Sequence, residues 1–323
     1  MSSIKDVARI AGVTPTTVSR VLNNRGYISE NTRKQVYEAM QQLNYQPNRI
    51  ARSLQSSKSD IIAILVPDSG SMFYSGLISQ VEWQCRIRDK RLLLCNSYTD
   101  PKLEREYIRI LNGQGVDGLI VCSHTLDIEH YEHVPFKLVT FDRILQSVPL
   151  VASDNFEGGR LAAKRLIDKG CTRLLHISGP LTNARLAGHN RYRGFAEYCN
   201  NCGVKYELFQ TDDKFGFSYY NSFVSDRLSG KLGAFDGAFC SNDMLAYALY
   251  RHAVSQGIRV PDDLKIIGFD NSQFVRILAD PKITVIAQDE AAIAEALVKN
   301  VLSPESAPPI TTVPVRLVEG TTA

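Results

Sequence analysis

A segment near the N-terminus combines small polar side chains and one arginine at positions that would share a helix surface. Thr14 is a good N-cap for such a helix, and Pro15 suits its first position, where the missing N–H costs nothing. The side chains that would point outward are Thr16, Thr17, Ser19 and Arg20. An arginine can donate two hydrogen bonds to guanine O6 and N7, and hydroxyl groups contact bases or phosphates. This pattern is typical of a helix that enters the DNA major groove.

Three short helices would position this surface. The first helix would form an apolar face from Ile4, Val7, Ala8 and Ala11. Gly12 can end that helix because it adopts the positive φ of a C-terminal cap. The second helix would turn three apolar side chains back toward the first, namely Val18, Val21 and Leu22. A third helix over residues 29–43, capped by Ser29, would close a small core with Val36, Ala39, Met40 and Leu43.

The charge of this head supports a nucleic-acid partner over the alternative of a plain helical hairpin. Residues 1–59 hold nine Lys or Arg and three acidic residues, a net charge of +6. The remaining chain holds 28 basic and 31 acidic residues, so the whole-chain charge of +3 conceals a basic head on an acidic body. Such asymmetry predicts contact with DNA by one end of the chain and binding that weakens steeply with salt.

A short basic segment follows the head. Pro47 would end the head, and residues 48–54 place Ile50, Ala51 and Leu54 on one side. A helix of this length is marginal alone in water, so we expect it to order only with a partner. Residues 55–59 are a polar linker. The predicted divisions are therefore a head over 1–46, a hinge helix and linker over 47–59, and a core over 60–323.

Composition excludes several other classes of protein. No window approaches the ~18 consecutive apolar residues of a membrane span, and the N-terminus lacks a secretory h-region, so we expect a cytoplasmic protein without membrane contact. The seven cysteines are scattered and odd in number, which favours reduced thiols. Cys199 and Cys202 have CxxC spacing, but no second such pair or histidine pair lies nearby, so no metal is expected.

Apolar runs alternate with amphipathic helices throughout the core. Strands are predicted over 61–66, 92–96, 118–122, 138–141, 174–177, 238–240, 266–269 and 311–315. Helices are predicted over 73–88, 101–112, 155–169, 191–202, 243–256 and 290–301. Strand–helix alternation with near-continuous apolar strands indicates an α/β fold of doubly wound parallel sheets. About 260 residues exceed what one such unit usually needs, so two lobes are expected.

Polar residues stand just after the predicted strands, where open α/β sheets bind ligands. They are Asp68, Asp142 with Arg143, Asp154, Asn242 with Asp243, and Asp270 with Asn271. Each of them could instead cap the following helix. Carboxylates, amides and arginine hold hydroxyl-rich ligands such as sugars, and aromatic rings cover the apolar faces of sugars. Rings could come from Phe73, Tyr74, Phe217, Tyr219 and Tyr220, although most aromatic residues belong to the core.

Several motifs together resemble the lactose-repressor (LacI/GalR) family of bacterial transcriptional regulators over essentially the whole chain. They occupy residues 4–8, 18–23, 44–48, 51–54, 116–119, 191–195, 241–243 and 267–270. The resemblance implies a homodimer that binds a pseudo-palindromic operator in double-stranded DNA. It assigns DNA contacts to Thr14, Pro15, Thr16, Thr17, Arg20, Asn23, Asn48, Arg49, Ala51, Arg52 and Leu54. In such proteins the leucine that matches Leu54 wedges into the central base step and kinks it.

The resemblance also implies a core like that of periplasmic binding proteins. Lobe 1 would comprise about 60–156 with 287–323, and lobe 2 about 157–286. The resemblance places effector contacts on Phe73, Tyr74, Arg191, Phe217, Asn242 and Asp270. The strand-end residues Asp68 and Asp142 complete the expected set. The implied function is a repressor of a carbohydrate-utilisation operon, controlled allosterically by a small sugar or sugar phosphate. Some relatives also bind a phosphorylated carrier protein, a partner that no surface motif of this chain supports.

Parts of the sequence are compatible with two other functions. The lobes alone would permit an exported or cytoplasmic sugar-binding protein, which the basic head argues against. Residues 113–118 match G-x-G-x-x-G, but they follow a helix and precede a strand, the reverse of a dinucleotide fingerprint. The six histidines show no H-E-x-x-H spacing. We therefore expect no catalytic residues and no cofactor, and the absence of C-terminal leucine heptads argues against a coiled-coil tetramer.

Overall fold

The computed structural model describes residues 3–22, 25–45, 59–126, 128–131, 134–182, 186–212, 214 and 216–323. Two compact units divide the chain, Met1–Ser59 and Asp60–Ala323. Within the described residues, no helix is long and apolar enough to cross a membrane. The predicted hinge helix and six predicted DNA contacts lie outside the described residues, namely Asn23, Asn48, Arg49, Ala51, Arg52 and Leu54.

The first unit contains the predicted three helices. They are α1 (Ile4–Ile10), α2 (Pro15–Leu22) and α3 (Glu30–Gln42). Ser3 and Asp6 form a capping box at the start of α1, and Gly12 has the expected positive φ of 66° after it. Val7, Val18 and Val36, one from each helix, are fully buried together. The apolar spacing therefore predicted both the helices and the core of the head correctly.

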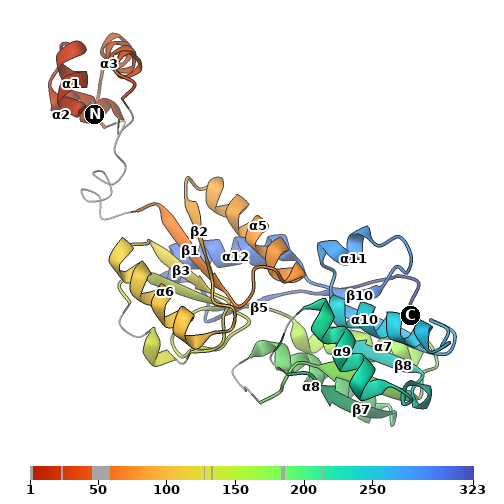
Figure 1. Ribbon diagram of the computed structural model, residues 1–323. Helices are drawn as coiled ribbons and strands as arrows, with labels where there is room; N and C mark the ends of the chain where they lie inside the picture. Colours follow the sequence, from red (N-terminus) through yellow and green to blue (C-terminus); the bar gives the residue numbers. More distant parts are fainter. Residues whose placement is uncertain are drawn as a thin grey trace. The chain divides into compact units, whose positions relative to one another are not determined.

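Lobe 1 of the second unit is a parallel sheet between helices (Figure 1). Its order is β11-β5-β4-β3-β1-β2. The strands are β1 (Ile61–Val66), β2 (Arg91–Asn96), β3 (Gly118–Val121), β4 (Lys137–Phe141), β5 (Leu150–Ser153) and β11 (Ile310–Val313). Helices α5 (Met72–Arg86) and α12 (Glu290–Leu302) pack on one face, and α6 (Pro101–Gln114) packs on the other. Short 3-10 turns lie at Ile128–His130 and Pro304–Ser306.

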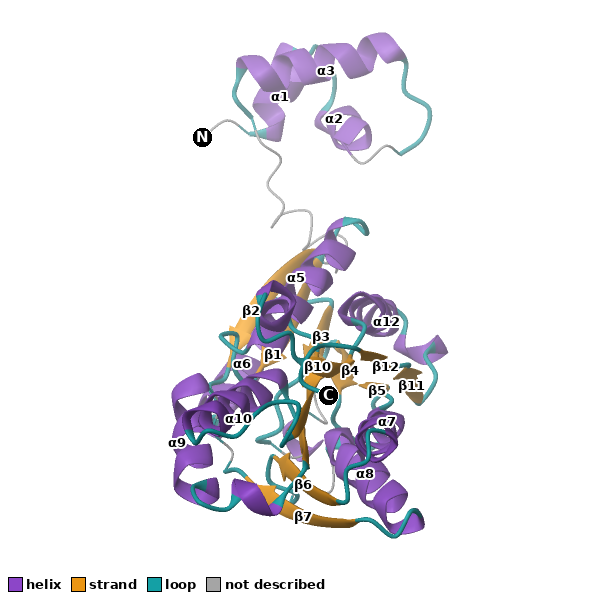
Figure 2. Ribbon diagram, turned by 90° about the vertical axis from the view of Figure 1, so that its right-hand side faces the viewer, coloured by secondary structure: helices purple, strands orange, loops and turns teal. Residues whose placement is uncertain are grey.

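Lobe 2 repeats this architecture, with strands between helices in Figure 2. Its order is β12-β10-β9-β8-β6-β7, with only β12 antiparallel. The strands are β6 (Arg173–Ser178), β7 (Lys205–Gln210), β8 (Gly237–Cys240), β9 (Lys265–Asp270), β10 (Thr284–Ala287) and β12 (Arg316–Val318). One face carries α7 (Asn155–Asp168) and α8 (Asn190–Asn201), and the other carries α9 (Phe217–Leu228) and α10 (Asp243–Ser255). The remaining short helices are α11 (Gln273–Ile277), Ala187–His189 and Leu232–Ala234.

The chain crosses between the lobes three times, after β5, after β10 and after β11. The third crossing differs from the expected boundaries, which assigned all of 287–323 to lobe 1. Pro314 interrupts the predicted strand 311–315 because proline cannot donate to a sheet ladder. The chain then forms β12 beside β10, and Thr322 Oγ1 accepts a hydrogen bond from Thr284 N at 2.9 Å. The C-terminal residues from Arg316 onward therefore belong to lobe 2.

Two glycines let α7 and α8 touch along their backbones. A Cβ atom on Gly159 would lie 1.9 Å from the carbonyl oxygen of Arg191. A Cβ atom on Gly194 would lie 1.9 Å from the carbonyl oxygen of Phe156. Since α8 begins at Asn190, this close approach fixes where the first turn of α8 lies relative to the strand ends.

An ion cluster holds the start of lobe 1. Lys90 Nζ lies 2.6 Å from Asp60 Oδ1 and 3.1 Å from Asp117 Oδ2. The backbone N–H of Asp60 also donates to Asp117 Oδ2 at 3.2 Å. These bonds join the first residue of the lobe to the loops that precede β2 and β3.

Candidate functional site

The outward face of α2 carries the predicted base-reading residues. Thr14, Pro15, Thr16 and Arg20 are exposed, and Thr17 is half-buried. Thr14 Oγ1 accepts a hydrogen bond from the backbone N–H of Thr17 at 3.2 Å, as an N-cap does. No acidic residue occurs within α2, so its surface offers hydroxyl groups and a guanidinium without a carboxylate to repel phosphate.

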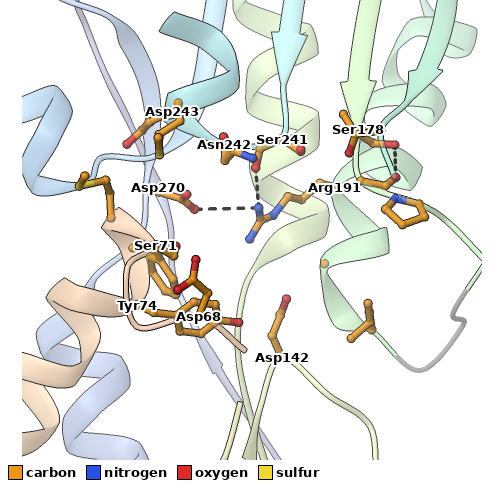
Figure 3. Close-up of a pocket in the computed structure, with 18 of the residues that line it drawn as sticks. Asp68, Ser71, Tyr74, Asp142, Ser178, Arg191, Ser241, Asn242, Asp243 and Asp270 are labelled. Carbon is orange, nitrogen blue, oxygen red and sulfur yellow. Dashed lines mark hydrogen bonds and ion pairs between the residues drawn. The ribbon is translucent and has the colours of Figure 1, made fainter. Parts of the chain in front are cut away.

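A cleft of about 260 Å³ lies between the lobes at the carboxyl ends of both sheets. Seven of the eight predicted effector residues line it: Asp68, Phe73, Tyr74, Asp142, Arg191, Asn242 and Asp270. In Figure 3, Asp68 and Tyr74 approach from lobe 1, and Arg191, Asn242 and Asp270 approach from lobe 2. The cleft is close in size to the smallest ligand sites of proteins, which begin near ~300 Å³.

Arg191 is fixed in this cleft by four groups. Its Nε donates to Asn155 Oδ1 at 2.7 Å, and its Nη1 donates to the Ser241 carbonyl at 2.7 Å. Its Nη1 also lies 4.0 Å from Asp270 Oδ1. The guanidinium carbon sits 3.7 Å from the centre of the Phe269 ring, within the range of a cation–π contact. The arginine is therefore preorganised by its Nε and Nη1 atoms and by the Phe269 ring.

Asp142 forms the lobe 1 side of the same network. It follows β4 in the left-handed region, with φ of 55°, and its Oδ1 accepts from Asn155 Nδ2 at 2.7 Å. Burial raises the pKa of Asp142, and the charge of Arg191 opposes that rise. Because Asn155 bonds both residues, an Asp142–Asn155–Arg191 chain joins lobe 1 to lobe 2 beside the cleft.

Asp270 is held in a matching way at the end of β9. Its Oδ1 accepts from Gln288 Nε2 at 2.7 Å, and Gln288 Oε1 accepts from Ser153 Oγ at 2.5 Å. Burial raises the pKa of Asp270 to about 7, against the opposing charge of Arg191. Gln288 was not predicted from the sequence, because β10, the strand before it, was not predicted.

The alternative role of helix capping holds for some strand-end residues. Asn242 Oδ1 caps α10 by accepting from Leu245 N at 2.9 Å, while its Nδ2 donates to the Tyr220 hydroxyl at 3.2 Å. Asp154 only caps α7 and does not line the cleft. Arg143 turns into lobe 1, where Nη1 lies 3.4 Å from Glu104 Oε1 in a buried polar network. The position of a residue after a strand therefore predicted the region of the site more accurately than it predicted the role of each residue.

Phe217 does not line the cleft. Its ring, at the start of α9, lies 5.6 Å from that of Tyr247, with the Arg251 guanidinium at 5.9 Å. Tyr220, one helical turn further on, lines the cleft instead. Because α9 was not predicted, the sequence could not show which of its aromatic residues faces the cleft.

His176 lines the cleft and was also not predicted. It lies within β6, packed between the rings of Tyr192 and Phe239, whose centres are 6.0 Å and 4.7 Å from its own. Its Nδ1 lies 2.9 Å from the carbonyl oxygen of Phe239. Burial lowers the pKa of His176 to about 4. A histidine inside an apolar strand carries no sequence signal that separates it from a core residue.

Among the described residues, no group of three or more His, Cys, Asp or Glu side chains could hold a metal ion. Cys199 is buried and Cys202 is exposed, and neither forms a disulfide.

A helix-turn-helix head joined to a two-lobed cleft core defines the class of bacterial transcription regulators. Residues 3–48 match the model of bacterial regulatory proteins of the lacI family, and residues 163–323 match the periplasmic binding protein-like domain. The sucrose operon repressor of Streptococcus mutans is 38% identical over 94% of this chain and 92% of its own length. The ribose operon repressor of Halalkalibacterium halodurans is 35% identical over 89% of this chain and 86% of its own length. The chain therefore belongs to the lacI family.

Solved structures support the fold. The lac repressor dimer bound to operator and an anti-inducer gives a TM-score of 0.85 at 23% identity, covering 99% of this chain and 98% of that chain. A regulator from Alkaliphilus metalliredigens, complexed with D-xylulofuranose, gives a TM-score of 0.75 at 26% identity, covering 82% of this chain and 99% of that chain. The matched relatives are repressors by name, which agrees with the prediction that the chain is not an enzyme.

Proposed function

We propose that this protein represses a carbohydrate-utilisation operon by binding a pseudo-palindromic DNA operator, and that a small sugar in the cleft controls the binding. The observation that carries the proposal is the occurrence in one chain of an exposed base-reading helix and a cleft with convergent carboxylates around a fixed arginine. Relatives are named as repressors of sucrose and ribose operons, and related structures hold cellobiose and ribose. Such a regulator acts on DNA in the cytoplasm.

Control would depend on the angle between the lobes. A ligand that replaces or strengthens bonds of the Asp142–Asn155–Arg191 chain changes the relative stability of open and closed lobes. A tenfold change in DNA affinity needs only about 1.4 kcal/mol of such coupling.

The homodimer in this proposal would pair through lobe 1. Trp83 on α5 and Ile87, the C-cap residue of this helix, are each 54% exposed, and Leu94 on the edge strand β2 is 44% exposed. Large apolar side chains grouped on one surface are typical of protein interfaces.

The function is tested by selecting duplexes from a random library with the full chain, and then by measuring operator affinity with and without sucrose, ribose and cellobiose. We expect enrichment of a symmetric site and a change in affinity of at least tenfold with one sugar. A chain that shows no preference for any symmetric duplex at moderate ionic strength would contradict the proposal. The same result would favour a sugar-binding protein without gene control.

Arg20→Ala should weaken binding to the selected operator about 5- to 100-fold, because a bidentate arginine–guanine contact provides about 1–3 kcal/mol of discrimination. Binding to random duplex should change far less. Fluorescence anisotropy on both duplexes measures the ratio. Lys34→Ala, which removes an exposed cation of α3, is the matched control and should leave selectivity intact. Unchanged selectivity in Arg20→Ala would show that α2 does not read the bases.

Trp83→Glu should convert the dimer to monomer at micromolar concentration, because it puts a charge in the proposed interface. Light scattering after size exclusion measures the mass. Ile310→Glu is the control, since Ile310 is 61% exposed on β11 at the opposite edge of the sheet. If Trp83→Glu dimerises over the same concentration range as the wild-type protein, the interface lies elsewhere.

A further inference from the structure

Carboxyl groups outnumber cationic groups among the side chains that line the cleft. Among the described lining residues, five carry carboxyl groups, namely Asp68, Asp142, Asp212, Asp243 and Asp270. Two carry permanent cations, Arg191 and the exposed Lys214. Arg191 already donates to Asn155 and to the Ser241 carbonyl, and it lies 4.0 Å from Asp270, so two of its three nitrogens are engaged within the protein. A ligand with a phosphoryl group would bring a further −1.5 to −2 charge into this surrounding.

Removal of solvent makes such repulsion costly. Asp243 and Asp270 are buried, with relative exposures of 1% and 8%, and Asp142 is half-buried. Burial raises the pKa of each of these three carboxyls, so their environment already disfavours negative charge. An anionic ligand would have to be accompanied by proton uptake on these carboxyls.

The hydrogen-bonding groups of the cleft also favour an uncharged ligand over an anionic one. A carbonyl oxygen can only accept, so the contact of His176 Nδ1 with the Phe239 carbonyl places the proton on Nδ1. Nε2 then carries a lone pair, and among the described residues this buried nitrogen has no hydrogen-bond partner. The low pKa of His176, about 4, keeps the ring neutral near pH 7. The cleft therefore offers acceptors on carboxylates and on His176, which a ligand hydroxyl satisfies and an ionised phosphoryl oxygen does not.

We propose that the cleft selects an uncharged, hydroxyl-rich sugar that donates a hydroxyl hydrogen bond to His176 Nε2, and that it rejects phosphorylated forms of the same sugar. This inference rests on the proposed function and narrows it, because a sugar-controlled repressor could take either form. Arg191 Nη2 would donate to a ligand oxygen, and Asp68, Asp142 and Asp270 would accept from hydroxyl groups, as their convergence in Figure 3 suggests.

The charge selection is tested with matched pairs of compounds on the full chain at about pH 8, where a carboxyl with a pKa of about 7 is largely ionised. The pairs are ribose and ribose 5-phosphate, fructose and fructose 6-phosphate, and sucrose and sucrose 6-phosphate. Thermal unfolding identifies a pair that binds, and calorimetry then measures both Kd values. We expect a neutral sugar to bind at least about 100-fold more tightly than its phosphate ester.

A phosphate ester that binds as tightly as its neutral partner, or more tightly, would overturn the inference while leaving the sugar-controlled repressor in place. If no compound of any pair binds or changes operator affinity, both this inference and sugar control fail. Asp142→Asn gives a charge-specific check, because it removes one negative charge with little change of shape. The ratio of the Kd of the phosphate ester to the Kd of the neutral sugar should fall about tenfold in that variant. Lys214→Ala removes an exposed cation and should not lower this ratio.

The role of His176 is tested separately. His176→Phe keeps an aromatic ring between Tyr192 and Phe239 but removes the accepting nitrogen, so affinity for the neutral sugar should fall about 10- to 100-fold. Thermal unfolding without sugar checks that the variant is folded. In wild-type protein labelled with ¹⁵N-histidine, the sugar should shift the Nε2 resonance of His176. This resonance is assigned as the one that is missing from the spectrum of His176→Phe. Unchanged affinity in His176→Phe, or an Nε2 resonance that sugar does not move, would remove His176 from the ligand contacts.

Discussion

Gly194→Ala should destabilise lobe 2 by about 3 kcal/mol or more, because the new methyl group would overlap backbone atoms that cannot rotate away. The nearest atom is the carbonyl oxygen of Phe156, 1.9 Å from the added Cβ, and the carbonyl carbon follows at 2.8 Å. Relief requires that α8 move away from α7, which would also open the buried contacts between these helices and β6. Chemical denaturation of the full chain, followed by far-ultraviolet circular dichroism, measures the change in the unfolding free energy.

The chain provides a matched control for this substitution. Gly113 also lies in a helix, α6, but an added Cβ there has nothing within 4 Å. Gly113→Ala should be neutral or stabilising by about 0.5–1 kcal/mol, since alanine is the better helix former. Equal unfolding curves for the two variants would mean that α7 and α8 do not touch at Gly194.

Arg191→Met should abolish the response of operator binding to the sugar identified in the tests above. The substitution removes the charge-assisted donor at the centre of the cleft and leaves Asp142 and Asp270 without their shared cation. Loss of one partner from a buried, hydrogen-bonded set of charges typically costs 2–5 kcal/mol of binding, which corresponds to at least about a 30-fold rise in Kd. Calorimetry gives the sugar affinity, and anisotropy gives the operator response.

Arg193→Met is the comparison for this variant. Arg193 lies two residues further along α8, is exposed, and donates to Asn190 Oδ1 at 2.9 Å. It should leave sugar binding unchanged. A normal sugar response in Arg191→Met would show that the ligand does not occupy the space between Arg191 and the carboxylates.

Sequence reasoning was most successful where a local rule determines structure. Helical spacing and end caps located the three helices of the head, and long apolar runs located β1 and β9. It missed β5, β7, β10 and β12. Three of these are short, with four residues each in β5 and β10 and three in β12, while β7 alternates in burial as an edge strand and lacks a long apolar run. Short and edge strands are defined by their neighbours in the sheet, which one sequence does not supply.

The same limit applies to the cleft. Residues that follow strands could be grouped because all parallel strands end at one edge, and five of the eight such residues line the cleft, namely Asp68, Asp142, Asn242, Asp243 and Asp270. The arginine of the cleft was expected only from the family resemblance. His176, inside a strand, and Gln288, after an unpredicted strand, enter the cleft only through tertiary packing. Phe217 was wrongly expected in the cleft. Its ring packs on Tyr247, and the ring that lines the cleft belongs to Tyr220, one turn further along α9.

The ion cluster at the start of lobe 1 has a mechanical consequence. Lys90 is only 16% exposed and bonds both Asp60 and Asp117, so the backbone at Asp60 moves as one body with the sheet. A tilt of the sheet therefore carries the first residue of the lobe with it. A ligand-binding core that holds its first residue in this way can change the direction of that residue by a change of angle alone, without refolding.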